Sequence, residues 1–239
     1  MKLLILILIL VLIYFKIFSL FEVPFRILHL VLYSKDKHYD NMQKLTNKYY
    51  KKFKNVDTYY YCYSPYIKGP YELKDNILYI KGDETYIPGI LKKTIDAFEY
   101  FNSFSYNYVI RSNISTIIRF DLLIPELKNK NIKYGCALPL SLNGINYSSG
   151  TSIILSPDTV NLIVKNRNKL DYSLIDDVSI GKYMKEENIY MTNINKFHFI
   201  TEFPTEEIFN KDIIFFRNRI SENREIDTNN MSKIIDILI

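Results

Sequence analysis

Hydrophobic positions recur along the middle of this chain with two different periods. Short runs of β-branched and aromatic residues, bounded by turn residues, predict strands at residues 59–63, 77–80, 107–111, 151–155 and 197–201. Between these runs, apolar residues at helical spacing predict helices that begin near Pro88, Phe120, Pro157 and Asp176. Strands that alternate with helices predict an α/β fold, in which a mostly parallel sheet is flanked by helices.

The first 23 residues are apolar almost without a break. Residues 3–15 form a continuous apolar run behind Lys2, and the run continues to Phe21 with Lys16 and Ser19 as polar interruptions. A helix of about 20 residues spans the hydrocarbon core of a bilayer, and no small-residue cleavage site follows the run. We therefore predict a transmembrane signal-anchor over residues 1–23 and a single-pass membrane protein.

The rest of the chain divides into three segments. Residues 24–55 begin with an apolar stretch and become basic and polar, which predicts either a juxtamembrane stem or the first helix of the domain. The alternating pattern occupies residues 56–220, where no linker or internal repeat indicates a second domain. Residues 221–239 are expected to form a polar C-terminal tail.

Charge and cysteine usage narrow the possible functions. The chain has 31 Lys and Arg against 26 Asp and Glu, and the two signs are interleaved without a basic stripe. This pattern argues against a nucleic-acid partner but is compatible with an anionic small ligand such as a nucleotide diphosphate. Cys62 and Cys136 have no metal-binding spacing, so they are either buried free thiols or a pair formed in an oxidising compartment.

Three short stretches carry the residues with chemical potential. The strand at 107–111 ends at Arg111 and is followed by Ser112 and Asn113, and the ends of strands form the ligand-binding rim in open α/β folds. A small-residue turn, Ser149-Gly150-Thr151, permits close approach of backbone to a ligand. The adjacent carboxylates of Asp176 and Asp177 open a helix, where one of them could serve as a general base.

The order of these stretches resembles the β-1,3-glycosyltransferase and Fringe group of GT-A glycosyltransferases. The matching pieces are Lys93-Thr94, the strand end Arg111 to Ser115, the strand Ser149 to Ser156, and the helix start Asp176-Asp177-Val178-Ser179-Ile180-Gly181. They cover roughly the middle half of the chain, and the last two are the most specific.

The resemblance implies a GT-A-like domain that transfers a sugar, with inversion, from a nucleotide-sugar to a hydroxyl of a glycan or glycoconjugate. UDP would be the nucleotide. Asp177 would be the base, and Asp176 would tune or orient it. The donor would contact Arg111, Ser112, Asn113, Lys93 and Glu84, and the acceptor or sugar would contact Ser149, Gly150 and Thr151. His198, a late histidine, would be a candidate for the metal or the diphosphate.

The chain departs from the family pattern at its metal motif. Where the family carries an acidic Asp-x-Asp triplet, this chain has Asn113, Ile114 and Ser115. An amide and a hydroxyl are poor ligands for Mn²⁺ or Mg²⁺, which prefer anionic oxygens. Either the protein works without a metal, with Arg111 and nearby lysines neutralising the pyrophosphate, or it is a non-catalytic module that binds glycan or protein beside the membrane.

Each candidate also has a plain structural interpretation. Acids in the first turn of a helix suit its dipole without any function, and Arg111 could be an ordinary surface residue. The turn at Ser149 could be a simple loop, His198 a structural residue, and Glu84 part of a solvated turn. The catalytic hypothesis requires that Arg111 and Asp177 share one cleft, whereas an unrelated membrane-tethered α/β protein would not place them together.

The side of the membrane on which the domain lies is open. Arg26, Lys35 and Lys37 follow the anchor, and the positive-inside rule favours a cytoplasmic domain. The resemblance implies instead a lumenal domain in an endomembrane of the Golgi or ER type.

Overall fold

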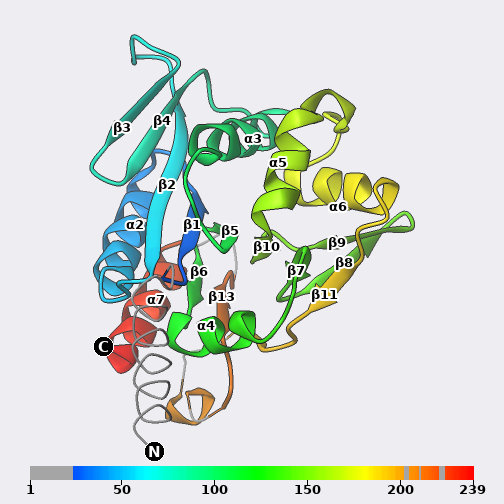
Figure 1. The fold of residues 1–239 in the computed structure, drawn as a ribbon. Helices are drawn as coiled ribbons and strands as arrows, with labels where there is room; N and C mark the ends of the chain where they lie inside the picture. Colours follow the sequence, from blue (N-terminus) through cyan, green and yellow to red (C-terminus); the bar gives the residue numbers. More distant parts are fainter. Residues whose placement is uncertain (1–23, 202–204, 210, 221–223) are drawn as a thin grey trace, which may run out of the picture.

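The computed structural model describes residues 24–201, 205–209, 211–220 and 224–239. Its centre is an eight-stranded sheet with the strand order β11-β7-β10-β5-β1-β2-β4-β3 (Figure 1). The strands are β1 (Ile27–Leu32), β2 (Val56–Ser64), β3 (Tyr71–Lys74), β4 (Ile77–Lys81), β5 (Tyr108–Asn113), β7 (Tyr134–Cys136), β10 (Ile153–Leu155) and β11 (Met191–Asn193). Strands β4, β2, β1 and β5 run parallel, whereas β3 pairs antiparallel with β4 and β10 with β5. The mixed α/β sheet with a parallel centre confirms the fold class.

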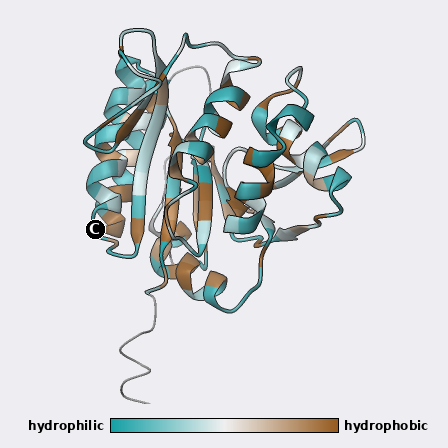
Figure 2. Ribbon diagram, turned by 45° about the horizontal axis from the view of Figure 1, so that its top comes forward, coloured by the Kyte–Doolittle hydropathy of each residue, from teal (hydrophilic) through white to brown (hydrophobic). Residues whose placement is uncertain are grey.

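Helices cover both faces of the sheet. Side chains of one face pack with the helices α2 (Lys37–Tyr50), α4 (Phe120–Lys128) and α7 (Arg224–Leu238). The other face packs with α3 (Gly89–Phe101), α5 (Pro157–Lys165) and α6 (Asp176–Glu186). Two 3-10 turns, η1 (Arg167–Lys169) and η2 (Glu206–Ile208), complete the helical segments of the described residues. Figure 2 shows hydrophobic residues concentrated on the strands, while the helices carry hydrophobic and hydrophilic sides.

Two smaller sheets stand beside the main one. One has the order β12-β13-β6 and consists of β12 (Phe197–Ile200), β13 (Phe215–Asn218) and β6 (Thr116–Ile118). The other is the hairpin of β8 (Pro139–Leu142) and β9 (Ile145–Ser148). Asn143 and Gly144 form its two-residue turn with φ of 48° and 76°, and positive φ at both positions is what a type I′ hairpin turn requires.

Two segments differ from expectation. Residues 24–55 hold α2, the first helix of the described residues, as the second of the two interpretations expected, but they also hold the unpredicted strand β1, which lies between β2 and β5 inside the sheet. Helices cover both faces of β1, so its residues are apolar on both faces apart from the buried His29, without the alternation of a half-exposed strand. Residues 224–238 form helix α7, which buries Met231, Ile234 and Ile235, and are not merely a polar tail.

The structure tests the prediction about the two cysteines but not the prediction of a membrane anchor. Cys62 and Cys136 are buried free thiols, which confirms the first of the two interpretations. The predicted anchor at residues 1–23 lies outside the described residues and stays a prediction. Within the described ranges, none of the helices is both long enough and apolar enough to span a bilayer.

Candidate active site

A large cleft opens at the carboxyl ends of the parallel strands. Its volume is about 1290 Å³, and its walls include Leu32 at the end of β1 and Asn113 at the end of β5, which are register partners. The starts of α3 and α6, the hairpin β8–β9 and the end of β13 complete the walls. This is the position at which open α/β sheets bind ligands, because the chain leaves adjacent strands there in loops.

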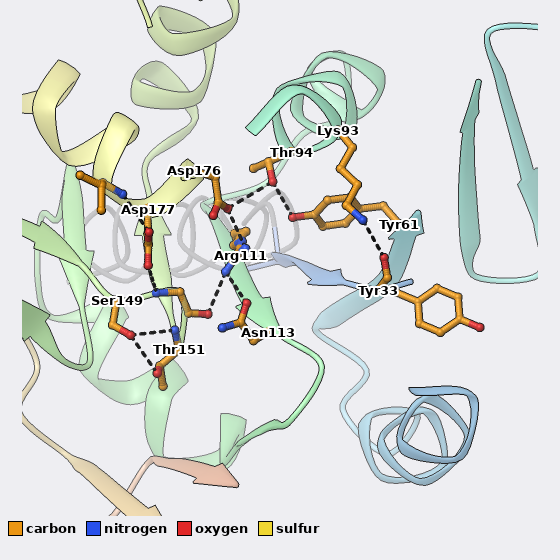
Figure 3. A network of polar contacts seen from close by, with 12 residues as sticks. Tyr33, Tyr61, Lys93, Thr94, Arg111, Asn113, Ser149, Thr151, Asp176 and Asp177 are labelled. Carbon is orange, nitrogen blue, oxygen red and sulfur yellow. Dashed lines mark hydrogen bonds and ion pairs between the residues drawn. The ribbon is translucent and has the colours of Figure 1, made fainter. Parts of the chain in front are cut away.

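Arg111 and Asp176 form a buried ion pair on the cleft wall. The guanidinium Nη2 lies 2.6 Å from Asp176 Oδ2, and the side chains are 1% and 2% exposed. Arg111 Nη1 also donates to Asn113 Oδ1 at 2.8 Å and to the carbonyl of Gly150 at 2.9 Å (Figure 3). One arginine therefore connects β5, α6 and the turn at Gly150, and most of its charge is satisfied within the protein.

The hydrogen bonds of Asp176 continue behind the ion pair. The hydroxyl of Thr94 donates to Asp176 Oδ2 at 3.3 Å, and the hydroxyl of Tyr61 lies 2.9 Å from that of Thr94. Strand β2 and helix α3 are thereby linked to the start of α6 (Figure 3). Because Arg111 and Thr94 both contact Oδ2 of Asp176, we expect this carboxylate to hold neighbouring elements of the cleft together.

Asp177 lies nearer the open space of the cleft. Its side chain is half-buried, its Oδ2 accepts the backbone N–H of Gly150 at 3.0 Å, and its Oδ1 accepts the N–H of Val178 at 2.9 Å. Burial and then the charge of Asp176 raise the pKa of Asp177, whereas Arg111 acts in the opposite direction. A carboxylate with a raised pKa holds an accepted proton better than an ordinary aspartate, as a general base must.

Two glycines allow these contacts. A Cβ atom on Gly150 would lie 2.5 Å from Arg111 Nη1, so a side chain there would displace the guanidinium. A Cβ atom on Gly181 would lie 2.4 Å from Tyr147 Cβ, where α6 packs against β9. The glycine four residues after Asp177 thus lets the helix approach the hairpin and sets the position of both carboxylates.

Lys93 and Glu84 form a second ion pair on the cleft wall. Lys93 Nζ lies 2.5 Å from Glu84 Oε2 and donates to the carbonyl of Tyr33 at 3.0 Å. Glu84 Oε1 accepts the backbone N–H of Tyr63 at 2.9 Å. Burial lowers the pKa of Lys93, and Glu84 partly offsets this effect. Both residues line the cleft, as predicted for the donor side, although their charges already face one another.

The other predicted site residues separate into two groups. Ser149, Gly150, Thr151 and Asn113 line the cleft. Ser112 does not, because alternate residues of a strand face opposite sides of the sheet and its hydroxyl lies 2.8 Å from His29 Nε2 in the core. His198 is also outside the cleft wall, to which its neighbour Phe199 contributes.

Three arginines that sequence reasoning missed also line the cleft. They are Arg217 in β13, Arg219 directly after β13, and Arg224 at the start of α7. The available signal was local: the apolar run at residues 213–216 is followed by arginines two positions apart, which places both on the same side of an extended chain.

The described residues of the cleft do not fit a divalent cation. Among the described residues, no group of three or more His, Cys, Asp or Glu side chains could hold a metal ion. At the position of the missing acidic triplet, Ser115 Oγ accepts a hydrogen bond from Arg217 Nη1 at 2.6 Å. A guanidinium beside an amide and a hydroxyl is the opposite of the anionic oxygen set that Mn²⁺ or Mg²⁺ prefers.

Comparison with known proteins finds similarity in structure only. No protein-family model and no curated protein matches the chain in sequence. A glycosyltransferase involved in the glycosylation of the major capsid of PBCV-1 is 14% identical with a TM-score of 0.48, and the match covers 86% of this chain and 98% of that one. The glycosyltransferase GlyE of Streptococcus pneumoniae TIGR4 is 10% identical with a TM-score of 0.49.

The apo form of GlyE is 11% identical with a TM-score of 0.50, and the match covers 89% of this chain. This chain spans 62% of the length of both GlyE structures. At such identity the likeness to the apo form concerns the fold alone. The chain therefore has a fold that a glycosyltransferase adopts, and the reaction must be argued from the cleft.

Proposed function

We propose that this protein is an inverting glycosyltransferase that moves a sugar from a nucleotide-sugar, UDP-linked, to a hydroxyl of a glycan or glycoconjugate. One observation carries the proposal: Asp177, a half-buried carboxylate with a raised pKa, lies on a cleft wall beside the buried Arg111–Asp176 pair. The cleft is at the carboxyl ends of the parallel strands, and the fold is shared with a glycosyltransferase.

The size of the cleft supports a reaction between two substrates. Pockets for single small molecules measure roughly 300–1,000 Å³. At about 1290 Å³, this cleft can hold a nucleotide-sugar and still admit an acceptor hydroxyl. Ser149 and Thr151 flank Gly150, whose N–H donates to Asp177, and both line the cleft, which supports their proposed contact with the acceptor or the transferred sugar.

The proposed step is a single displacement. The acceptor oxygen forms a bond to the anomeric carbon as its proton passes to Asp177. The bond from that carbon to the diphosphate oxygen breaks, and its electron pair leaves with the diphosphate. Hydrogen bonds from the N–H groups of Gly150 and Val178 hold the carboxylate of Asp177 in place. Asp176 acts as a positioning residue, because it faces Arg111 and not the open cleft.

A second candidate function is favoured by one observation. The position of the acidic triplet carries Asn113, Ile114 and Ser115, so a non-catalytic module that binds a nucleotide or glycan would have the same cleft without the reaction. In both cases residues 1–23 would tether the protein to a membrane. The resemblance favours an endomembrane with a lumenal domain.

Replacement of the proposed base, Asp177, distinguishes the glycosyltransferase from the non-catalytic binding module. Asp177→Asn keeps the size of the side chain but removes its ability to accept a proton, so we expect turnover of UDP-sugars to fall by roughly 10²- to 10⁴-fold. UDP binding should persist. Because the pKa of Asp177 is raised, the wild-type rate should fall as the pH drops, at a pH above that of an ordinary aspartate.

A matched control is available in the neighbouring helix. Asp158 is an exposed acid in the first turn of α5, and Asp158→Asn should leave turnover unchanged. Absence of turnover with every donor sugar, together with UDP binding, would support the non-catalytic module. An Asp177→Asn variant as active as wild type would refute the role of Asp177.

A further inference from the structure

Strand β13 brings a positive charge to the position of the missing acidic triplet. It pairs antiparallel with β6, and Arg217 is the register partner of Thr116. The backbone N–H of Asn218 donates to the carbonyl of Ser115 at 2.9 Å, and Arg217 Nη1 donates to Ser115 Oγ at 2.6 Å. The end of β13 is thus held against the residues that follow β5, and the guanidinium of Arg217 lies beside them.

The charge of Arg217 is buried, and the described residues provide no carboxylate that pairs with it. Its side chain is 7% exposed. Across the described part of the chain, no acidic side chain forms an ion pair with Arg217 or Arg219, whereas Arg224 pairs with Asp227 and Arg111 with Asp176. Leaving a buried charge without a partner is costly, so this arrangement indicates that an anion completes it.

The pKa of Arg217 reflects the same imbalance. Burial lowers it to about 9, and the charges of Arg224, Arg219 and Arg111 act in the same direction, while Asp227 opposes them. At neutral pH the guanidinium therefore still carries its charge, in surroundings that disfavour it. A bound anion would relieve this repulsion and stabilise the fold.

We propose that Arg217 and Arg219 bind the diphosphate of the donor and supply the positive charge that a divalent cation would otherwise provide. This inference rests on the proposed function. Both arginines line the cleft that contains Asp177, and they extend from the same side of β13 and its continuation. A guanidinium presents several N–H donors in a planar fork that matches phosphate oxygens.

The two arginines also suit the reaction step. When the bond from the anomeric carbon to the diphosphate oxygen breaks, the electron pair and its negative charge stay on the diphosphate. Arg217 and Arg219 would stabilise that charge with fixed donors, and the step needs no further reactant. Arg111 is less suited to this task than predicted, because its charge is matched by Asp176 and its Nη1 is bound to Asn113 and Gly150.

Titration of the full-length protein with inorganic pyrophosphate, followed by calorimetry, tests this assignment. We expect binding in EDTA to equal binding in Mn²⁺ within about twofold. Arg219→Gln removes a charge-assisted hydrogen bond from an exposed residue and should weaken binding about tenfold. Arg217→Lys keeps the charge but loses the fork and should weaken it by a similar factor. Arg26→Gln, an exposed arginine outside the cleft, should bind as wild type.

The outcomes distinguish this inference from the proposed function. Pyrophosphate binding that requires Mn²⁺, or that is unchanged in both arginine variants, would overturn the inference even if Asp177-dependent sugar transfer is observed. Metal-independent binding that both variants weaken would support it even if no donor sugar is turned over. If Arg217→Lys does not fold, Arg219→Gln decides the question, because its side chain is exposed and makes no ion pair among the described residues.

Discussion

At the scale of single residues, the two adjacent aspartates differ because their surroundings differ. Asp176 is buried against the guanidinium of Arg111, which stabilises its charge. Asp177 is half-buried, has backbone N–H partners, and has its pKa raised by burial and by Asp176. Environments that differ in this way can give neighbouring carboxylates separate roles, which under the proposed function would be positioning for Asp176 and proton acceptance for Asp177.

The Arg111–Asp176 pair should show the behaviour of a buried ion pair. Asp176→Asn leaves the guanidinium of Arg111 buried without its counter-ion, so we expect a loss of about 3–5 kcal/mol in the free energy of unfolding, measured with urea. The double variant Arg111→Met with Asp176→Leu should recover part of this loss, because it leaves no unpaired buried charge.

A more exposed ion pair provides the control. Asp171 and Lys182 lie 2.7 Å apart, and their side chains are 28% and 39% exposed. Asp171→Asn should cost much less than Asp176→Asn, because water solvates the charge that remains. Equal losses in the two single variants would contradict the assignment of Arg111–Asp176 as a structural centre of the cleft.

At the scale of elements, the helix that carries both aspartates is positioned by its contact with a hairpin. Helix α6 packs on β9 through Gly181, whose missing side chain leaves room for Tyr147 and for the carbonyl of Asn146. The spacing from Asp177 to Gly181 is one turn of helix, so the close approach fixes the first turn relative to the Gly150 loop. The glycine is therefore part of the architecture of the site.

Substitution of Gly181 sets two effects against each other. Alanine favours helix over glycine by about 1 kcal/mol, but its Cβ atom would lie within 2.9 Å of backbone atoms of the hairpin. Overpacking of this kind costs about 1–3 kcal/mol, so Gly181→Ala should destabilise the protein on balance in urea unfolding and should reduce turnover by displacing Asp177.

Gly69 provides the control for the Gly181→Ala substitution. A Cβ atom there would be 3.7 Å from its nearest neighbour, the carbonyl of Tyr71, which is an ordinary contact. Gly69→Ala should therefore leave both stability and turnover unchanged. A Gly181→Ala variant as stable and as active as Gly69→Ala would show that the contact with the hairpin does not position the helix.

The elements also show where sequence reasoning succeeded and where it failed. Helices α3, α4, α5 and α6 and strands β2, β4 and β5 follow from local periodicity, because each has a clear apolar pattern between turn residues. Strand β1 was missed because it has no alternation, His29 interrupts its apolar residues, and it follows the predicted anchor closely. Helix α7 was missed although its buried residues at 227, 230, 231, 234 and 235 keep helical spacing, because polar Asp227 and Asn230 occupy part of that face.

At the scale of the whole molecule, a histidine lies in the core between the sheet and its helices. His29 is fully buried in the central strand β1, and its ring lies edge-on to Tyr50 and Phe120 at centroid distances of 4.8 and 5.2 Å. Its Nε2 lies 2.8 Å from the hydroxyl of Ser112. Burial lowers the pKa of His29 to about 3, so the ring is neutral in the folded protein.

This histidine makes the stability of the fold depend on pH. Between the unfolded pKa of about 6.5 and the folded value of about 3, the unfolded state binds the extra proton. The contribution of the neutral, buried His29 to the free energy of unfolding is therefore complete above about pH 6.5. It is lost as the pH falls below that value, at up to about 1.4 kcal/mol per pH unit. Urea unfolding from pH 7 to pH 4 should show this slope as a difference between the wild type and His29→Gln. If the free energies of unfolding of the two proteins instead fall in parallel between pH 7 and pH 4, burial of His29 does not disfavour its protonation.

The sequence by itself determined the α/β class, helices α3 to α6, and strands β2, β4, β5, β10 and β12, and it offered buried free cysteines and a shared cleft for Arg111 and Asp177 as interpretations. These features depend on local periodicity and on the rule that adjacent parallel strands end at one edge of the sheet. Only the tertiary structure decided that Arg111 is matched by Asp176, that Ser112 faces the core, and that Arg217 reaches Ser115. The last contact joins residues 102 positions apart through the pairing of β13 with β6, and no local pattern encodes such a long-range register.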